Sequence, residues 1–380
     1  MIRSRSAALA ALILSASAAP LPAQPAQAPA TVTSSAGPVV AETVARLSSP
    51  WGLAFLPDGR MLVTERLGQL KLVTRDGKVA EVAGAPKVRA QGQGGLLDIA
   101  LDRGFDQNRM PYLCYAEEMP GGGRTAMASA RLSEDASALS DFKVIFRQEG
   151  PPTRGNHYGC RIAQGADGNL FLGMGDHSTH REEAQNLANH LGKIVRVRPD
   201  GTVPDDNPFV KDKAARPEIW SYGHRNIQGM TLDPASGALW ATEHGPRGGD
   251  ELNRIEPGKN YGWPVIGYGM NYDGSPAHRS THRDGMEQPV KQWTPVIAAS
   301  GLAVYRGDLF PAWKGQLFAG GLAGKVLVRL DVRDGKVAGE ERLLQELNER
   351  IRDVRAGPDG ALWVLTDGPS GRLLRLAPAS

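Results

Sequence analysis

A histidine and an aspartate that flank one hairpin-like segment are of the types that general base catalysis needs. His157 lies in Asn-His-Tyr-Gly-Cys-Arg, just before an alternating segment, and Asp176 ends the partner strand of the same hairpin. A histidine with a pKa near neutrality can accept a proton from a hydroxyl group. A carboxylate beside it can orient the imidazole and stabilise its charged form. We interpret the pair as a base with its partner; the alternative is a histidine that only caps a strand end.

Two arginines near the C-terminus suit an anionic ligand. Arg350 and Arg352 alternate along a predicted strand, so both side chains point to one face. Guanidinium groups match carboxylates in a bidentate way, so this face suits an anion that carries several carboxylates. The alternative is a pair of outward salt bridges with Glu346 or Glu349.

The segment from Thr242 to Asn253 could hold calcium. It reads Thr-Glu-His-Gly-Pro-Arg-Gly-Gly-Asp-Glu-Leu-Asn. Calcium takes about six to eight oxygen ligands and often mixes backbone carbonyls with carboxylates. Glycine and proline here predict an irregular turn whose carbonyls escape sheet pairing, and Asp250 and Glu251 add negative charge. Spacing alone makes this a weak metal signal.

A repeated strand unit must position these residues. The unit is a short alternating strand, a turn rich in Pro, Asp and Gly, and a second strand, which together are typical of a hairpin. Four copies begin at Gly52, Arg161, Gly229 and Arg352, and two looser copies begin at Leu96 and Gly301. Six units over about 340 residues leave roughly 57 residues each, enough for four strands and a loop.

The repeats therefore predict an all-β fold, a six-bladed β-propeller of four-stranded antiparallel sheets. Val39 to Leu47 would close the ring beside the last blade. A two-sheet sandwich is the main competitor, but six matching hairpins are hard to house in it. Strand ends of a propeller converge on a central channel, where distant residues can meet. The candidates for this meeting are Gln93, His157, Asp176, Arg225, Asn226, His244, Arg350 and Arg352.

The N-terminus predicts export. Arg3 and Arg5 precede an apolar run from Ala7 to Ala19, followed by small residues and prolines, which is typical of a secretory signal. We predict a signal peptide over residues 1–28 with an uncertain cleavage point, a linker over 29–38 and the propeller over 39–380. The apolar run is shorter than the roughly twenty residues of a spanning helix, and no second run is longer. The mature chain would be periplasmic or secreted.

Composition excludes some classes of function. The net charge of +3 is spread without basic blocks, so the chain does not resemble a nucleic-acid binder. Cys114 and Cys160 could pair in an oxidising compartment, but two cysteines cannot make a disulfide scaffold. Whether they pair is left open by the sequence.

Several long phrases resemble one known family from Pro50 to Leu376. They read PWGLAFLPDGRMLVTER, GQGGLLDIAL, NHYGCRI with GMGD, SYGHRNIQGM, TEHGPRGGDELN with NYGWP, and RIRDVRAGPDG. The family is that of the soluble aldose sugar dehydrogenases that depend on pyrroloquinoline quinone (PQQ), relatives of soluble glucose dehydrogenase and of sorbosone dehydrogenase. The resemblance implies a six-bladed propeller that oxidises aldose sugars at C1 to lactones, using PQQ and Ca2+, and passes electrons to an acceptor of unknown identity.

The resemblance also implies roles for the candidate residues. His157 would take the sugar hydroxyl proton while hydride moves to the quinone, with Asp176 as its partner and Gln93 lining the site. The cofactor-binding residues would be Arg225, Asn226, His244, Arg350 and Arg352. Arg225 and Asn226 would hydrogen-bond the quinone oxygens, and Arg350 and Arg352 would bind the cofactor carboxylates. The calcium ligands would be the carbonyls of Gly245 and Pro246 at the cofactor, and, at a second, structural ion, Glu251 and the backbone of Tyr261, with Asp250 as a further candidate.

The chain departs from the glucose-oxidising relatives at two positions. His244 stands where they have Gln, and Ala323 stands at the position of a lysine that contacts the cofactor, with Lys325 two residues further along. The missing lysine supports one alternative, a non-catalytic periplasmic binding propeller. A second alternative is a calcium-dependent propeller lactonase, which would need a ring of Glu, Asn and Asp around a metal in the channel.

Overall fold

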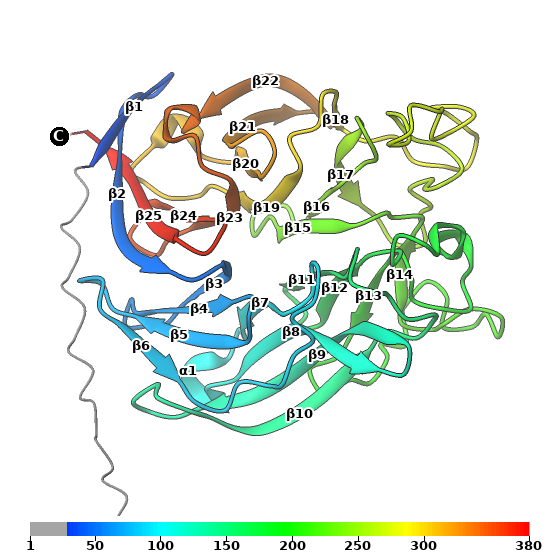
Figure 1. Ribbon diagram of the computed structural model, residues 1–380, viewed down its shortest axis with the longest axis horizontal. Coiled ribbons are helices and arrows are strands. Elements are labelled where there is room, and N and C mark those ends of the chain that lie inside the picture. The colour runs from blue at the N-terminus through cyan, green and yellow to red at the C-terminus, as the bar shows by residue number, and fades with distance from the viewer. Residues whose placement is uncertain (1–28, 380) are drawn as a thin grey trace, which may run out of the picture.

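Six β-sheets arranged in a ring make up the protein. A computed structural model describes residues 29–379, and Figure 1 looks down the ring. Five sheets have four strands and one has five, and every pairing within them is antiparallel. The predicted six-bladed β-propeller is therefore confirmed. The signal peptide predicted for residues 1–28 lies outside the described residues.

Each blade is built from strands that follow one another along the chain. Blade 1 holds β3 (Pro50–Phe55), β4 (Met61–Glu65), β5 (Gln69–Val73) and β6 (Val79–Val82). Blade 2 holds β7 (Leu96–Leu101), β8 (Pro111–Met119), β9 (Gly122–Leu132) and β10 (Leu139–Arg147). Blade 3 holds β11 (Gly159–Gln164), β12 (Leu170–Met174), β13 (Lys193–Val197) and β14 (Ile219–Tyr222).

The second half of the ring repeats this pattern. Blade 4 holds β15 (Ile227–Leu232), β16 (Leu239–Glu243), β17 (Asp250–Ile255) and β18 (Lys291–Trp293). Blade 5 holds β19 (Ala299–Val304), β20 (Leu317–Gly321), β21 (Val326–Arg333) and β22 (Lys336–Leu343). Blade 6 holds β23 (Ile351–Ala356), β24 (Leu362–Thr366) and β25 (Gly371–Pro378), completed by β2 (Gly37–Leu47) and β1 (Ala30–Ser34).

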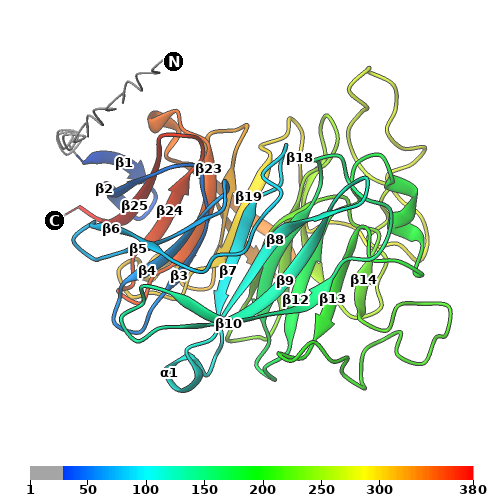
Figure 2. The same cartoon turned by 60° about the horizontal axis from the view of Figure 1, so that its bottom comes forward.

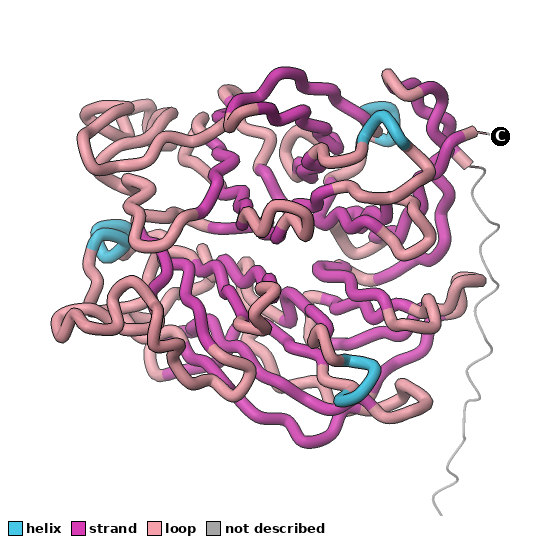
Figure 3. The backbone as a smooth tube through the Cα atoms, turned by 180° about the vertical axis from the view of Figure 1, so that it is seen from behind, coloured by secondary structure: helices cyan, strands magenta, loops and turns pink. Residues whose placement is uncertain are grey.

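Helices within the described residues are short pieces in the loops (Figure 3). They are α1 (Phe105–Asn108) and the 3-10 helices η1 (Arg181–Gln185), η2 (Pro311–Trp313) and η3 (Gln345–Leu347). Between residues 29 and 379, no helix has the length and apolar character needed to cross a membrane.

The ring closes as predicted, but the predicted linker is folded. β2 pairs with β25 and so joins the N-terminal end of the fold to the last blade. Residues 29–38 were expected to be an unstructured linker, yet β1 lies within this range and pairs with β2. Val32 and Val39 are buried in the blade 6 core. The linker prediction was wrong here. Two buried valines are enough to hold a short strand in place when the edge of a neighbouring strand is already available for pairing.

The loops of the ring divide between two rims. In each antiparallel blade, the turns between strands one and two and between three and four reach one end. The remaining loops reach the other end, as the tilted view of Figure 2 lets the reader follow. We call this second end the site rim. It carries loops 83–95, 148–158, 175–192, 223–226, 244–249 and 344–350, which hold most of the candidate residues.

Charged side chains fill the middle of the ring. The inner strands β3, β7, β11, β15, β19 and β23 contact one another in sequence around it. Arg161 lies between Asp98 and Asp353, at 3.2 and 3.1 Å. Arg355 also reaches both aspartates, at 2.8 and 2.9 Å. Buried charges are stable only when paired, so these four residues tie the three strands β7, β11 and β23 together below the site rim.

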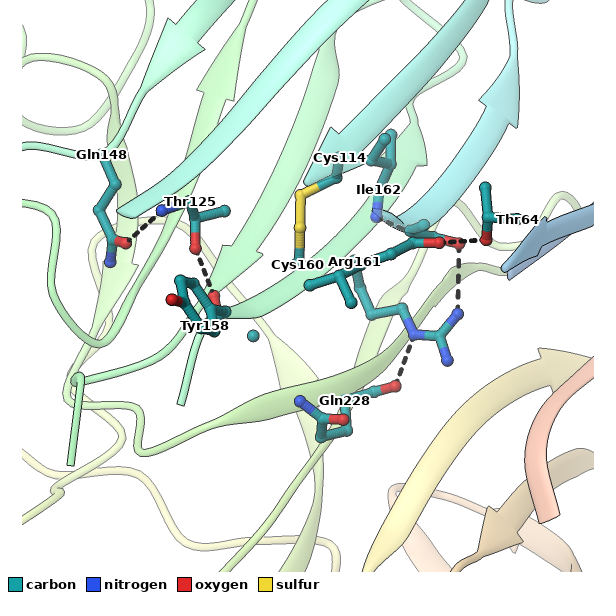
Figure 4. Close-up of a disulfide and its surroundings, with 12 residues drawn as sticks. Thr64, Cys114, Thr125, Gln148, Tyr158, Cys160, Arg161, Ile162 and Gln228 are labelled. Carbon is teal, nitrogen blue, oxygen red and sulfur yellow. Dashed lines mark hydrogen bonds and ion pairs between the residues drawn. A yellow bond between two sulfur atoms is a disulfide. The ribbon is translucent and has the colours of Figure 1, made fainter. Parts of the chain in front are cut away.

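A disulfide joins blades 2 and 3 (Figure 4). Cys114 on β8 and Cys160 on β11 are bonded, with their Cα atoms 5.7 Å apart, and both are fully buried. The pairing that the sequence left open is therefore present. Cys160 lies three residues after His157, so the bridge anchors β11, the strand that follows the candidate base.

Candidate active site

The structure brings His157 and Asp176 together at the site rim. His157 precedes β11 and Asp176 follows β12, and these two strands pair, so the ends of one hairpin set the distance. The imidazole Nδ1 lies 2.6 Å from Asp176 Oδ1. The backbone N–H of His157 donates to Gln93 Oε1 at 2.9 Å, which places the third predicted residue beside the pair.

The Asp176 carboxylate is fully buried and accepts three hydrogen bonds. Oδ1 accepts from His157 and from the backbone N–H of Ser178 at 2.7 Å, and Oδ2 accepts from the indole N–H of Trp263 at 2.7 Å. Burial alone would raise the pKa of Asp176, but the hydrogen bond and charge of His157, the charge of Arg225 and the Ser178 bond hold this pKa below its ordinary value. Asp176 is therefore an anion, and His157 Nδ1 must carry the shared proton.

Arg225 and Asn226 lie beside this pair in loop 223–226. Arg225 Nη1 donates to the carbonyls of His244 and Gly245, at 2.9 and 2.7 Å. Asn226 Oδ1 accepts from the backbone N–H of Gly159 at 3.1 Å, while its Nδ2 is buried and without a hydrogen-bond partner in the described part of the chain. An unpaired buried donor is costly, so Asn226 has an amide hydrogen to offer a ligand.

A cavity of about 350 Å³ opens beside these residues. Its lining includes Ser49, Trp51, Arg66, Gln93, Tyr158, Gln228, His244, Leu322, Arg350, Arg352 and Asp367. Three arginines against one aspartate make the lining cationic. The volume lies within the range of pockets that bind small molecules, so the cavity can hold an anion of cofactor size.

Arg350 and Arg352 share one carboxylate in this cavity. Both bind Asp367, at 2.9 and 3.5 Å. Neither outward salt bridge considered from the sequence is found among the described residues, because Glu349 pairs with Arg372 and Arg350 pairs with Asp367 at the wall of the cavity. Arg352 Nη1 also donates to Gln228 Oε1 at 3.2 Å. Burial lowers the pKa of Arg352 to about 10, so it keeps its charge at neutral pH.

The neighbouring cavity, of about 20 Å³, collects most of the residues implied as calcium ligands. Gly245, Pro246, Glu251 and Tyr261 line it together with Glu243. Burial, together with the charge of Glu243, raises the pKa of Glu251 to about 8. The described residues contain no group of three or more His, Cys, Asp and Glu side chains spaced to hold a metal. Any cation here would depend on backbone carbonyls.

Asp250 lies outside this cavity, whereas His244 reaches it. Asp250 is not in the lining of this cavity; its carboxylate accepts from the backbone N–H groups of Gly245 and Ala299, at 2.9 and 3.2 Å. Burial raises the pKa of Asp250 to about 6. His244 lines both cavities, and burial and the charge of Arg225 lower its pKa to about 3, so its imidazole is neutral.

The absent family lysine is not replaced. Ala323 is exposed, and Lys325 donates to Asn348 Oδ1 at 2.9 Å rather than pointing into the larger cavity, where Leu322 lies instead.

Four further residues complete the site and were not found from the sequence. Trp263 donates to Asp176, and Glu243 accepts from the backbone N–H of Arg225 at 2.6 Å. Gln228 and Asp367 both bind Arg352. Glu243, Trp263 and Gln228 do lie inside phrases that carry the family resemblance, which was the available signal.

Comparison with known proteins identifies the family. The family model described as glucose/sorbosone dehydrogenase matches residues 47–375. The chain belongs to this family. As a glucose/sorbosone dehydrogenase family member it is a sugar dehydrogenase, an oxidoreductase, as the sequence predicted.

Individual relatives agree. The chain is 47% identical over 338 residues to the aldose sugar dehydrogenase YliI of Escherichia coli K12, covering 88% of this chain and 91% of the relative. The soluble aldose sugar dehydrogenase of Escherichia coli, solved in its apo form, superposes with a TM-score of 0.87 at 45% identity, over 90% of this chain and all (100%) of that one. The PQQ-bound aldose sugar dehydrogenase of Streptomyces coelicolor superposes with a TM-score of 0.74 at 31% identity, over 89% and 98%.

Proposed function

We propose that this family member oxidises aldose sugars at C1 to lactones, with PQQ as the electron acceptor in the site, Ca2+ as its metal and His157 as the base. The observation that carries the proposal is the His157–Asp176 pair beside a cationic cavity of about 350 Å³. A relative that is 31% identical has been solved with PQQ bound, which supports the choice of cofactor.

The residues present fit a tricarboxylate quinone. Arg350 and Arg352 offer guanidinium groups to its carboxylates, in competition with Asp367. Buried polar atoms without partners among residues 29–379 include Asn226 Nδ2, His244 Nε2 and Arg225 Nε, which would serve quinone and carboxylate oxygens. When bound, the quinone supplies a two-electron acceptor for hydride.

The residues also fit calcium, with one exchange. The Gly245 carbonyl accepts from Arg225, so a metal ligated there would take over a hydrogen bond that Arg225 now makes. The released guanidinium group could then pair with negative charge on the reduced cofactor. For the second ion, Glu251 and Glu243 line one small cavity that they share with a single arginine, Arg225, and two carboxylates in such a space favour a cation.

His157 does the proton chemistry. Because Nδ1 donates to Asp176, Nε2 holds the lone pair and accepts the proton of the sugar C1 hydroxyl. The Asp176 anion stabilises the imidazolium that results. Arg225, held over the Trp263 ring at 5.1 Å, is preorganised to stabilise negative charge that develops during the transfer.

Export completes the proposal. The N-terminal signal pattern and a buried disulfide both favour an oxidising compartment, so the mature protein is periplasmic or secreted. Its partners are an aldose sugar and an electron acceptor that nothing in the chain identifies.

Two alternatives predict different outcomes. The lactonase would use channel carboxylates as metal ligands, but Asp98 and Asp353 are both bound by arginines. The non-catalytic propeller is favoured by the exposed Ala323 and the outward Lys325.

Reconstitution tests the proposal. Purified protein is mixed with PQQ and Ca2+, uptake is followed by absorbance, and dye reduction is measured over a panel of aldoses. We expect saturable binding at micromolar PQQ and sugar-dependent dye reduction that needs both additions. Lack of PQQ uptake, turnover without added PQQ, or hydrolysis of lactones in its place would refute the proposal.

A further inference from the structure

The indole of Trp263 reaches from another blade to Asp176, the partner of the proposed base His157. Trp263 lies in the long segment between β17 and β18, and its Nε1–H donates to Asp176 Oδ2 at 2.7 Å. Asp176 is 87 residues away in the chain. Both atoms of this bond are buried, so no solvent molecule competes for the carboxylate oxygen.

The backbone of Trp263 is itself held in place. Its N–H donates to the carbonyl of Gly223 at 2.9 Å, and its carbonyl accepts from Gln185 Nε2 at 2.6 Å. Gln185 and Asn260 also exchange two amide hydrogen bonds, at 3.0 and 2.8 Å. Loops 175–192 and 223–226 therefore fix the indole before any ligand arrives.

The faces of the indole are occupied as well. The guanidinium groups of Arg225 and Arg181 lie 5.1 and 5.5 Å from the ring centre, and His278 packs edge-on at 5.1 Å. A guanidinium group within about 6 Å of a ring centre is attracted to the face of the ring. Together with the bond to Asp176, these contacts keep the N–H directed at the carboxylate.

We propose that Trp263 is a positioning residue for His157: its indole N–H holds the Asp176 carboxylate in the orientation that accepts the Nδ1 proton of His157. The inference rests on the proposed function for its catalytic consequence, although the geometry stands without it. Trp263 acts only through Asp176 and does not donate to substrate.

Loss of the indole N–H should shift the pKa of the His157 imidazole in one direction, upward. Oδ2 would be left buried without a donor, and its negative charge would act more fully on His157. A stronger anion beside an imidazole favours the imidazolium and raises its pKa. The other titratable or charged groups facing the pair are Arg225, His177, His180 and His244, and Arg181 and His278 face the indole. None of them changes in the test below.

Trp263→Phe removes the N–H and keeps an aromatic ring in contact with Arg225 and Arg181. Trp220→Phe is the matched control, because Trp220 also packs under an arginine, Arg196 at 5.0 Å, while its indole N–H has no acceptor in residues 29–379. If Trp263→Phe fails to fold, benzothienyl-alanine at position 263 replaces only the N–H by sulfur and keeps the ring shape.

Three measurements are made on the full chain. They are kcat and KM against pH for an aldose with PQQ and Ca2+, the Kd for PQQ, and the titration of the His157 imidazole by NMR without sugar. For Trp263→Phe we expect kcat to fall about 10- to 100-fold, since a hydrogen bond to a charged group is lost. KM and the PQQ Kd should change less than about threefold, as for an interaction used only in the chemical step.

The pH profile separates positioning from a merely structural role. The acid limb of kcat and the NMR titration of His157 should both move to higher pH, by up to about one unit, and Trp220→Phe should move neither. An unmoved His157 titration in Trp263→Phe overturns the inference. A shifted titration in a protein that shows no sugar oxidation even as wild type upholds the positioning role and refutes the proposed function instead.

Discussion

Removal of the disulfide between Cys114 and Cys160 is expected to lower the free energy of unfolding, because the unfolded chain gains conformational entropy when the crosslink is lost. The two cysteines are 46 residues apart in the sequence. In the chain-entropy treatment, a crosslink that closes a loop of this size stabilises the fold by about 4 kcal/mol. For a chain of this length, a loss of that size lowers Tm by roughly 5 °C.

The double variant Cys114→Ala/Cys160→Ala tests this by thermal and urea unfolding. The urea midpoint should fall, and the slope of free energy against urea should rise, because the unfolded chain without a crosslink exposes more surface. Wild type unfolded in the presence of reductant is the control and should approach the variant. The single variant Cys114→Ala should match the double variant within about 1 kcal/mol, since the crosslink is already lost.

Activity per folded molecule should persist in the double variant. The Tyr158 carbonyl accepts from Thr125 Oγ1 at 2.7 Å, and Asn226 holds the Gly159 N–H, so contacts other than the disulfide fix the end of β11. A Tm within about 1 °C of wild type with an unchanged urea slope would refute the entropic reasoning. Loss of activity with retained fold would show that the bridge positions His157.

Three further outcomes follow from the site. His157→Ala should lower kcat at least about 100-fold while PQQ still binds, because only the base is removed; near-normal turnover would contradict its role. Arg352→Ala should raise the PQQ Kd about 10- to 100-fold with little effect on kcat at saturation. Arg350→Ala should raise the PQQ Kd by a smaller factor, because the Arg350 side chain is 47% exposed and that of Arg352 is 10% exposed. Equal increases in the PQQ Kd would refute this ranking. Ca2+ at one hundred times its Kd should stabilise wild type by about 2.7 kcal/mol in thermal unfolding; Glu251→Gln should lose much of that gain, and an identical gain in both proteins would place the structural ion elsewhere.

The sequence by itself determined the features that depend on neighbouring residues. Asp-Gly turns between alternating strands predicted the blades, because a hairpin is specified by its own turn and its own period of two. The His157–Asp176 pair followed from the same local logic, since both residues flank one hairpin. Val39 to Leu47 was likewise recognised as the strand that closes the ring, and β2 does so.

Tertiary structure alone decided which side chains meet across blades. Asp367, rather than Glu346 or Glu349, receives Arg350 and Arg352, and the Gly245 carbonyl receives Arg225. The pairing of Cys114 with Cys160, the folding of β1 and the contact of Trp263 with Asp176 were decided in the same way. The alternation of residues along a strand predicts which face a side chain occupies. Which side chain it meets on another blade depends on the orientation of the blades relative to one another in the closed ring. That orientation results from the packing of the whole ring, so no local segment of the sequence specifies it.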